Sequence, residues 1–169
     1  MRKGNLLLQP QVSLPAGRLH EYAERYTSPR LMTDPRPFGT FDLDAIVKGF
    51  PDTSDTMLID TRLTDEPDAS CRVFRIYTDV PGHYHATCDE YLLVIAGRGT
   101  IFIGDSTPFE VAPGQLVFFK KGMIHGLTVI EHPFVFLSVD TPRRHPRDII
   151  FVNPADGTPD TFIKTRNLY

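Results

Sequence analysis

The sequence predicts an all-β protein. From residue 57 onward, short apolar segments of strand length alternate with turn-forming residues such as Pro81-Gly82 and Gly104-Asp105-Ser106, which is the pattern of strands joined by tight loops. The composition agrees, because 12 glycines, 15 prolines, 12 phenylalanines and 6 tyrosines favour turns and strands over long helices. Eight or nine strands with no long helix between them predict a closed or double-sheet antiparallel barrel.

Residues 1–40 are predicted to form an extension that packs outside the barrel. Prolines interrupt it and leave room for one short helix around 18–26, where apolar residues recur at helical spacing. A second short helix is predicted at 43–48, because Asp42 can cap its N-terminus and Gly49 can end it. The rest of the chain, 41–169, is predicted to be one barrel domain. Its strands are expected near 57–63, 71–78, 90–96, 100–104, 108–112, 115–119, 124–130, 133–140 and 148–152.

Charge and cysteine content narrow the class of partner. The net charge is −3 and no basic stripe is present, which argues against binding to nucleic acid or to an anionic membrane. The longest late apolar run, 91–96, is too short to span a bilayer. Cys71 and Cys88 alone cannot build a disulfide framework, which favours a reduced, cytoplasmic setting. A small molecule is therefore the expected partner.

Three of the six histidines and one glutamate form a candidate metal site. If the segment 83–85 is extended, His83 and His85 point to the same face. A chain reversal between residues 86 and 89 would bring the Glu90 carboxylate beside them, and His125 is a fourth candidate beyond the strand near 115–119. Three imidazoles and one carboxylate suit one divalent metal such as Fe, Mn, Ni, Cu or Zn better than Ca or Mg.

The same residues resemble the two sequence motifs of the cupin superfamily. Residues 82–97 resemble the first motif, in which HxH is followed by Glu and then Gly, and residues 114–125 resemble the second, in which Gly precedes PxGxxH. The resemblance covers roughly residues 70–140 and implies a cupin-type jelly-roll β-barrel, or double-stranded β-helix. By the family's pattern, His83, His85, Glu90 and His125 would ligate the metal, with iron favoured.

The sequence departs from the family pattern at positions that are not ligands. Pro81-Gly82 directly precedes His83, whereas the first Gly of the family's motif usually stands six residues before the first His. Gln115 stands where Asp is common, Lys120 where Pro is expected, and Val129 where Asn often ends the motif. These differences concern the subfamily and the substrate.

The resemblance implies a small-molecule metalloenzyme of dioxygenase type. The alternatives are a metal-dependent isomerase or lyase acting on a sugar or keto acid, and a non-catalytic cupin that binds a small ligand. If strand parity continued unbroken to His83, Arg75 and Tyr77 would share its face and could contact the substrate. A homodimer is also expected, because cupins commonly pair and the apolar N-terminal extension could cover an open edge strand.

Overall fold

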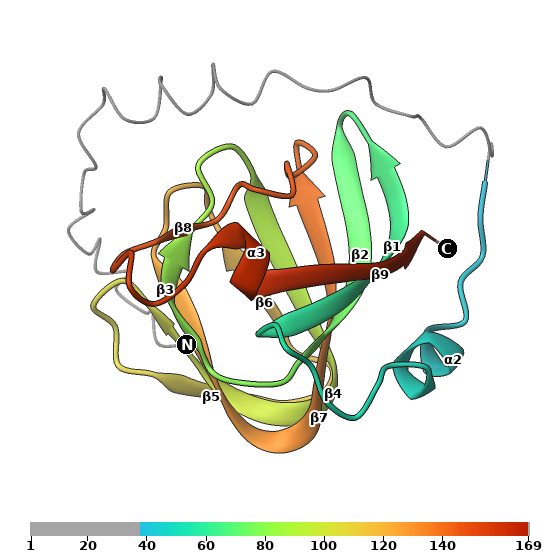
Figure 1. The fold of residues 1–169 in the computed structure, drawn as a ribbon, viewed down its shortest axis with the longest axis horizontal. Helices are drawn as coiled ribbons and strands as arrows, with labels where there is room; N and C mark the ends of the chain where they lie inside the picture. The colour runs from blue at the N-terminus through green and yellow to red at the C-terminus, as the bar shows by residue number, and fades with distance from the viewer. Residues whose placement is uncertain (1–37, 169) are drawn as a thin grey trace, which may run out of the picture.

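Nine strands and two short helices make up residues 38–168, the part of the chain that the computed structural model describes (Figure 1). The helix predicted around 18–26 lies outside these residues. The helices are α2 (Leu43–Lys48) and α3 (Pro159–Phe162). The strands are β1 (Leu58–Glu66), β2 (Ala69–Ile76), β3 (Val80–Tyr84), β4 (Asp89–Ile103), β5 (Phe109–Val111), β6 (Leu116–Phe119), β7 (His125–Thr141), β8 (Ile150–Phe151) and β9 (Ile163–Leu168).

The strands form one curled sheet of jelly-roll type, as the sequence predicted. Its main order is β5-β4-β7-β2-β1-β9, while β6 also pairs with β4, and β3 pairs with both β7 and β8. The sheet bends around a core without closing into a continuous ring. All pairings are antiparallel except that of β1 with β9, which is parallel. Neither β9 nor α3 was predicted, and Figure 1 shows β9 crossing near β1.

Two predicted turns are in fact parts of long strands. The expected strands 90–96 and 100–104 are one strand, β4, and 124–130 and 133–140 are one strand, β7. Gly97 has φ 73° and lies at a register irregularity between β4 and β7, where a Cβ atom would be 2.2 Å from the Pro133 carbonyl oxygen. A Cβ at Gly99 would be 2.4 Å from the Phe134 ring. These glycines therefore allow a bulged strand to approach its neighbour closely.

The α2 prediction is confirmed residue by residue. The Asp42 side chain accepts a hydrogen bond of 3.0 Å from the Ala45 amide, and Gly49 ends the helix. Buried Ile46 packs with Phe50 against the outer face of the sheet, over Ile59 and other residues of β1, β2 and β7. This outer cluster is separate from the inner core, which lies within the curl of the sheet.

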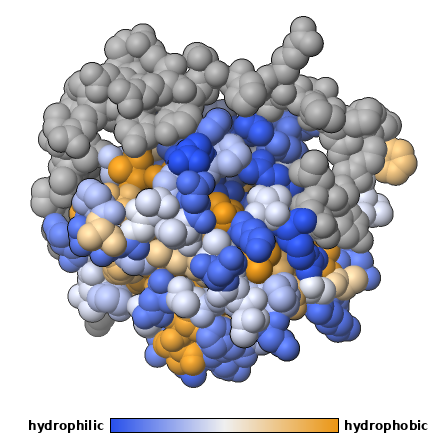
Figure 2. All heavy atoms as spheres, viewed as in Figure 1, coloured by the Kyte–Doolittle hydropathy of each residue, from blue (hydrophilic) through white to orange (hydrophobic). Residues whose placement is uncertain are grey.

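The inner core is apolar at one end and polar at the other. Leu58, Phe74 and Phe136 belong to the apolar part. Further along the same strands, β1, β2 and β7, the buried side chains are charged. Among residues 38–168, no helix has the length and apolar character that crossing a membrane requires. On the face seen in Figure 2, hydrophilic side chains predominate and hydrophobic ones occur in separate groups.

Candidate metal centre

The sheet brings together the four residues that the sequence singled out. His83 lies in β3, His125 is the first residue of β7, and these two residues are paired in register. His85 follows β3 directly, and Glu90 lies near the start of β4. Strands β3 and β4 pair not with each other but each with β7. All four side chains are consequently buried at one place inside the jelly roll.

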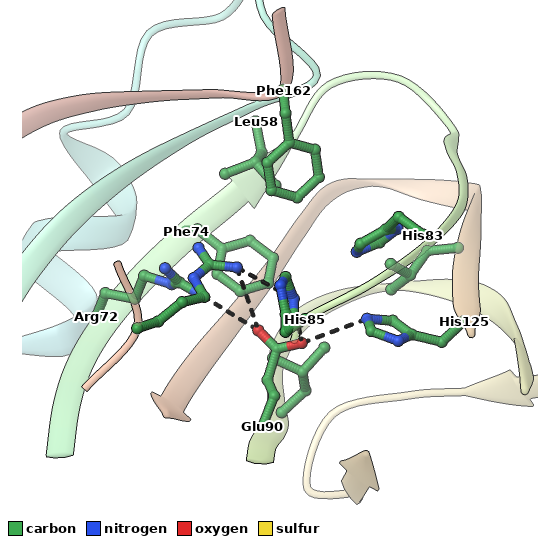
Figure 3. Close-up of a pocket in the computed structure, with 11 residues that line it drawn as sticks. Leu58, Arg72, Phe74, His83, His85, Glu90, His125 and Phe162 are labelled. Carbon is green, nitrogen blue, oxygen red and sulfur yellow. Dashed lines mark hydrogen bonds and ion pairs between the residues drawn. The ribbon is translucent and has the colours of Figure 1, made fainter. Parts of the chain in front are cut away.

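The spacing of the donor atoms matches a small coordination site. One ring nitrogen of each of the three histidines lies within 4.8 Å of those of the other two. The Oε2 atom of Glu90 is 3.4 Å from Nε2 of His85 and 3.4 Å from Nε2 of His125. Figure 3 shows the Glu90 carboxylate pointing between these two rings, with His83 above His125.

Backbone carbonyls fix which nitrogen of each ring is free. Nδ1 of His83 is 2.9 Å from the Pro81 carbonyl oxygen, and Nδ1 of His125 is 2.9 Å from that of Met123. Nδ1 of His85 is 2.5 Å from the Asp148 carbonyl oxygen. A carbonyl only accepts hydrogen bonds, so each Nδ1 carries the hydrogen and each Nε2 keeps a lone pair. This is the state that imidazole needs to ligate a metal, and the donor set fits a borderline divalent ion.

Electrostatics favour the same protonation states. Burial, together with the neighbouring imidazoles of His125 and His85, holds the pKa of His83 well below its usual value. Burial alone would raise the pKa of Glu90. However, the guanidiniums of Arg72 and Arg144 lie 3.1 and 4.0 Å from Oε1 of Glu90 and favour the anionic carboxylate. The site thus combines a neutral His83 with an anionic Glu90.

Comparison with known proteins gives the family. Residues 76–140, which include all four candidate ligands, match the family model described as a cupin domain. The chain contains a cupin domain. Among curated proteins, the protein y4oW of Sinorhizobium fredii is 42% identical over 53 residues, which cover 31% of this chain and 24% of that protein. The matched segment is therefore about a quarter of that relative's length.

Two solved structures share the cupin fold of this chain. A Klebsiella pneumoniae protein with a double-stranded β-helix domain aligns with a TM-score of 0.52 and 22% identity, over 62% of this chain and 90% of that one. The protein BH2720 of Bacillus halodurans aligns with a TM-score of 0.53 and 20% identity, over 71% of this chain and 93% of that one. At these identities the likeness establishes the fold.

Two buried arginines, which the sequence analysis missed, also line the cupin pocket. Arg72 Nη2 is 3.1 Å from Oε1 of Glu90 and 3.2 Å from Oδ2 of Asp140. Arg144 Nη1 is 3.2 Å from Nε2 of His85 and 4.0 Å from Oε1 of Glu90. Arg72 had a sequence signal, because it alternates with the apolar residues Phe74 and Ile76 in a predicted strand. Arg144 lies in the loop after β7 and had none.

Arg75 and Tyr77 do not reach this pocket, and the expectation that they contact a substrate there is wrong. The Arg75 guanidinium and the Tyr77 hydroxyl both donate to the Pro51 carbonyl oxygen, at 2.9 and 2.8 Å. Arg75 also lies over the Tyr77 ring, 4.8 Å from its centroid. The chain bends between β2 and β3, so the alternation of β2 does not carry over to His83. The inward residues of β2 are instead Arg72, Phe74 and Ile76.

The remaining pocket wall is apolar. It is formed by side chains from β1, β2, β4, β7 and α3, namely Leu58, Phe74, Leu92, Leu127 and Phe162. Phe162 is buried although α3 is a single short turn, and Figure 3 shows its ring on the far side of the pocket from Glu90. The wall therefore keeps water away from the imidazoles and leaves charged groups on the Glu90 side.

Asp148 organises the loop that carries His85. Its carboxylate accepts hydrogen bonds from the amides of Ala86 and Thr87, at 2.8 and 3.0 Å, and from the Thr87 hydroxyl at 2.5 Å. Its own carbonyl oxygen binds Nδ1 of His85. A single residue near the C-terminus thus fixes both the loop and the ring orientation of one candidate ligand.

Proposed function

We propose that the protein is a small-molecule metalloenzyme of dioxygenase type. It holds one divalent metal, for which iron is the first candidate. His83, His85, Glu90 and His125 would bind it. The observation that carries this proposal is that all three histidines direct a hydrogen-free Nε2 into one buried site beside an anionic carboxylate. When bound, such a metal supplies a redox centre and a Lewis acid.

The chain's own residues would prepare the site for that chemistry. Glu90 supplies negative charge to a divalent cation, and Arg72 holds the second carboxylate oxygen of Glu90 at 3.1 Å so that Oε2 faces the imidazoles. The apolar wall around Phe74 and Phe162 excludes water, which strengthens electrostatic interactions inside the pocket.

The test is turnover of a small-molecule panel by protein loaded with iron, nickel, manganese or zinc, in air and without oxygen. The iron form should consume oxygen, and zinc should not replace iron because zinc has no redox chemistry. Glu90→Gln should lose turnover, whereas Glu110→Gln, which changes an exposed carboxylate paired with Arg98, should keep it.

Two outcomes would contradict the dioxygenase proposal. Turnover that persists with zinc and without oxygen would indicate the isomerase or lyase alternative, because only charge stabilisation is then required. Saturable binding of a small molecule without product, with every metal and in both atmospheres, would indicate a binding protein.

A further inference from the structure

We propose that Arg144 is the group that recognises the substrate, and that this substrate is a small organic carboxylate. The inference rests on the proposed metal centre and names the substrate class of the same pocket. Arg144 is 4% exposed, and its Nη1 donates to Nε2 of His85 at 3.2 Å.

That hydrogen bond is incompatible with a metal on His85. A neutral imidazole has one acceptor nitrogen, and Nδ1 of His85 is already the donor to the Asp148 carbonyl oxygen. Nε2 can therefore either accept from Arg144 or bind a metal, but not both. Metal binding must displace the Arg144 guanidinium and leave it inside the protein without this partner.

The carboxylates of the pocket are already shared with a second arginine. Glu90 and Asp140 lie 3.1 and 3.2 Å from Arg72 Nη2, whereas their nearest ion-pair distances to Arg144 are 4.0 and 3.9 Å. The Nε atom of Arg144 makes no hydrogen bond. A displaced Arg144 would thus have donors to spare and no carboxylate of its own within hydrogen-bond distance.

The charge balance points to an anionic ligand. Buried Asp60 is a further carboxylate near Arg72. Burial alone would lower the pKa of Arg72, but the charges of Asp140, Glu90 and Asp60 raise it. Once displaced from His85, the Arg144 guanidinium has no such partner, because the nearest carboxylate oxygens, those of Asp140 and Glu90, lie 3.9 and 4.0 Å away. Buried charge without a counter-charge is costly, so a ligand with a single negative charge completes the site.

The shape of the donors and the wall select a carboxylate among anions. A guanidinium offers parallel N–H groups that match the two oxygens of a carboxylate. Apart from the two arginines and the four candidate ligands, the wall consists of Leu58, Leu92, Leu127 and two phenylalanines, which offer no hydrogen-bond donors and suit the apolar body of an organic ligand. The ligand is therefore expected to pair one carboxylate, next to Arg144, with a short apolar body.

Calorimetric titration of zinc-loaded protein tests this without turnover. Butyrate and benzoate should bind, and their uncharged amides and inorganic phosphate should bind at least tenfold more weakly. Arg144→Gln should weaken carboxylate binding at least tenfold, and Arg144→Lys should restore part of it because the charge returns. Arg147→Gln is the matched control, since Arg147 is exposed and pairs with Asp160.

Zinc affinity separates recognition from a structural role. Because Arg144 competes with the metal for His85, Arg144→Gln should bind zinc at least as tightly as the wild type. If zinc does not bind the wild type, the metal proposal fails and this inference fails with it. If zinc binds but amides and carboxylates bind equally, or phosphate binds as well as butyrate, or Arg144→Gln leaves carboxylate affinity unchanged, only the assignment of Arg144 is overturned.

Discussion

His83 and His125 are oriented by the backbone beside them, whereas His85 depends on a distant residue. The carbonyls that hold His83 and His125 belong to residues two positions earlier in the chain, Pro81 and Met123. The carbonyl that holds His85 belongs to Asp148, 63 residues later. Two of the candidate ligands are therefore arranged locally, and the third only when the C-terminal part of the jelly roll is in place.

Replacing His125 tests the proposed donor set. A metal that binds only the folded protein stabilises it by about 4 kcal/mol at a thousandfold excess over Kd. His125→Ala should lose this metal-dependent rise in Tm while the barrel still folds, because the apolar strands around the site remain. Differential scanning calorimetry with and without zinc measures this rise in Tm. The control His132→Ala, at an exposed position, should keep the full rise. An unchanged rise in His125→Ala would show that the metal binds elsewhere.

The metal-free protein should become less stable below about pH 6.5. The unfolded chain takes up a proton on His83 near its ordinary pKa of 6.5, whereas the folded protein takes it up only at a much lower pH. The contribution of His83 to the free energy of unfolding is therefore fully present above pH 6.5. It falls as the pH drops, by about 1.4 kcal/mol per pH unit for one proton. Glu90, whose pKa is lowered on folding, adds a loss in the same direction below pH 4.5.

Urea unfolding at pH 7.5, 6.5 and 5.5 in the presence of a chelator measures this dependence. His83→Gln has no titrating group at this position, so its stability should change less between pH 6.5 and 5.5 than that of the wild type. Equal slopes for the two proteins would contradict the assignment to His83.

At the scale of elements, β7 joins the two halves of the site. Its first residue is His125, it pairs with β4 along nearly its whole length, and its C-terminal half pairs with β2, which carries Arg72. The loop after β3 is less well supported by strands, and Asp148 supplies its hydrogen bonds instead. The candidate ligand His85 is thus the one held by a loop.

Removing the Asp148 carboxylate should destabilise this loop. Asp148→Ala leaves two partly buried amides and one hydroxyl without a charged acceptor, so the free energy of unfolding should fall by about 3 kcal/mol. Asp148→Asn should cost less, because one oxygen can still accept. Asp160→Asn, which weakens an exposed ion pair with Arg147, should change stability by less than about 1 kcal/mol. Denaturant melts decide this, and equal values for Asp148→Ala and Asp160→Asn would refute the role of Asp148.

At the scale of the whole molecule, one side of the sheet remains apolar and exposed. β5 and β6 each pair only with β4 within the described residues, and Phe109, Leu116 and Phe118 on them are 39, 62 and 47% exposed. An open edge with exposed apolar side chains favours pairing with a second copy or with the N-terminal extension. The homodimer stays a prediction.

Light scattering at micromolar concentration checks the oligomeric state. The expected mass is about twice that of the 19.1 kDa chain. The double variant Leu116→Glu/Phe118→Glu places charges on the exposed face of β6 and should give the monomer mass if this face is the interface. A wild-type mass of about 19 kDa would reject the dimer.

Features that depend on residues close together in the sequence were predicted better than features that depend on distant segments. The caps of α2 and the motif residues His83, His85, Glu90 and His125 are set by neighbours in the sequence, and the structure places them where the sequence indicated. Gly97 lies in the gap predicted between the strands 90–96 and 100–104 but is part of one continuous strand, because a glycine serves equally in a turn and in a bulge. Arg144 and the parallel pairing of β9 with β1 depend on segments far apart in the chain, which local patterns do not reveal.

The most direct test of the account is anomalous diffraction from crystals of protein purified without chelator and supplied with iron or zinc. We expect one peak per chain, between His83, His85, His125 and Glu90, with imidazole nitrogens about 2.0–2.3 Å from the ion. A peak elsewhere, or no peak when metal is in excess, would contradict the claim that these four residues form a metal centre.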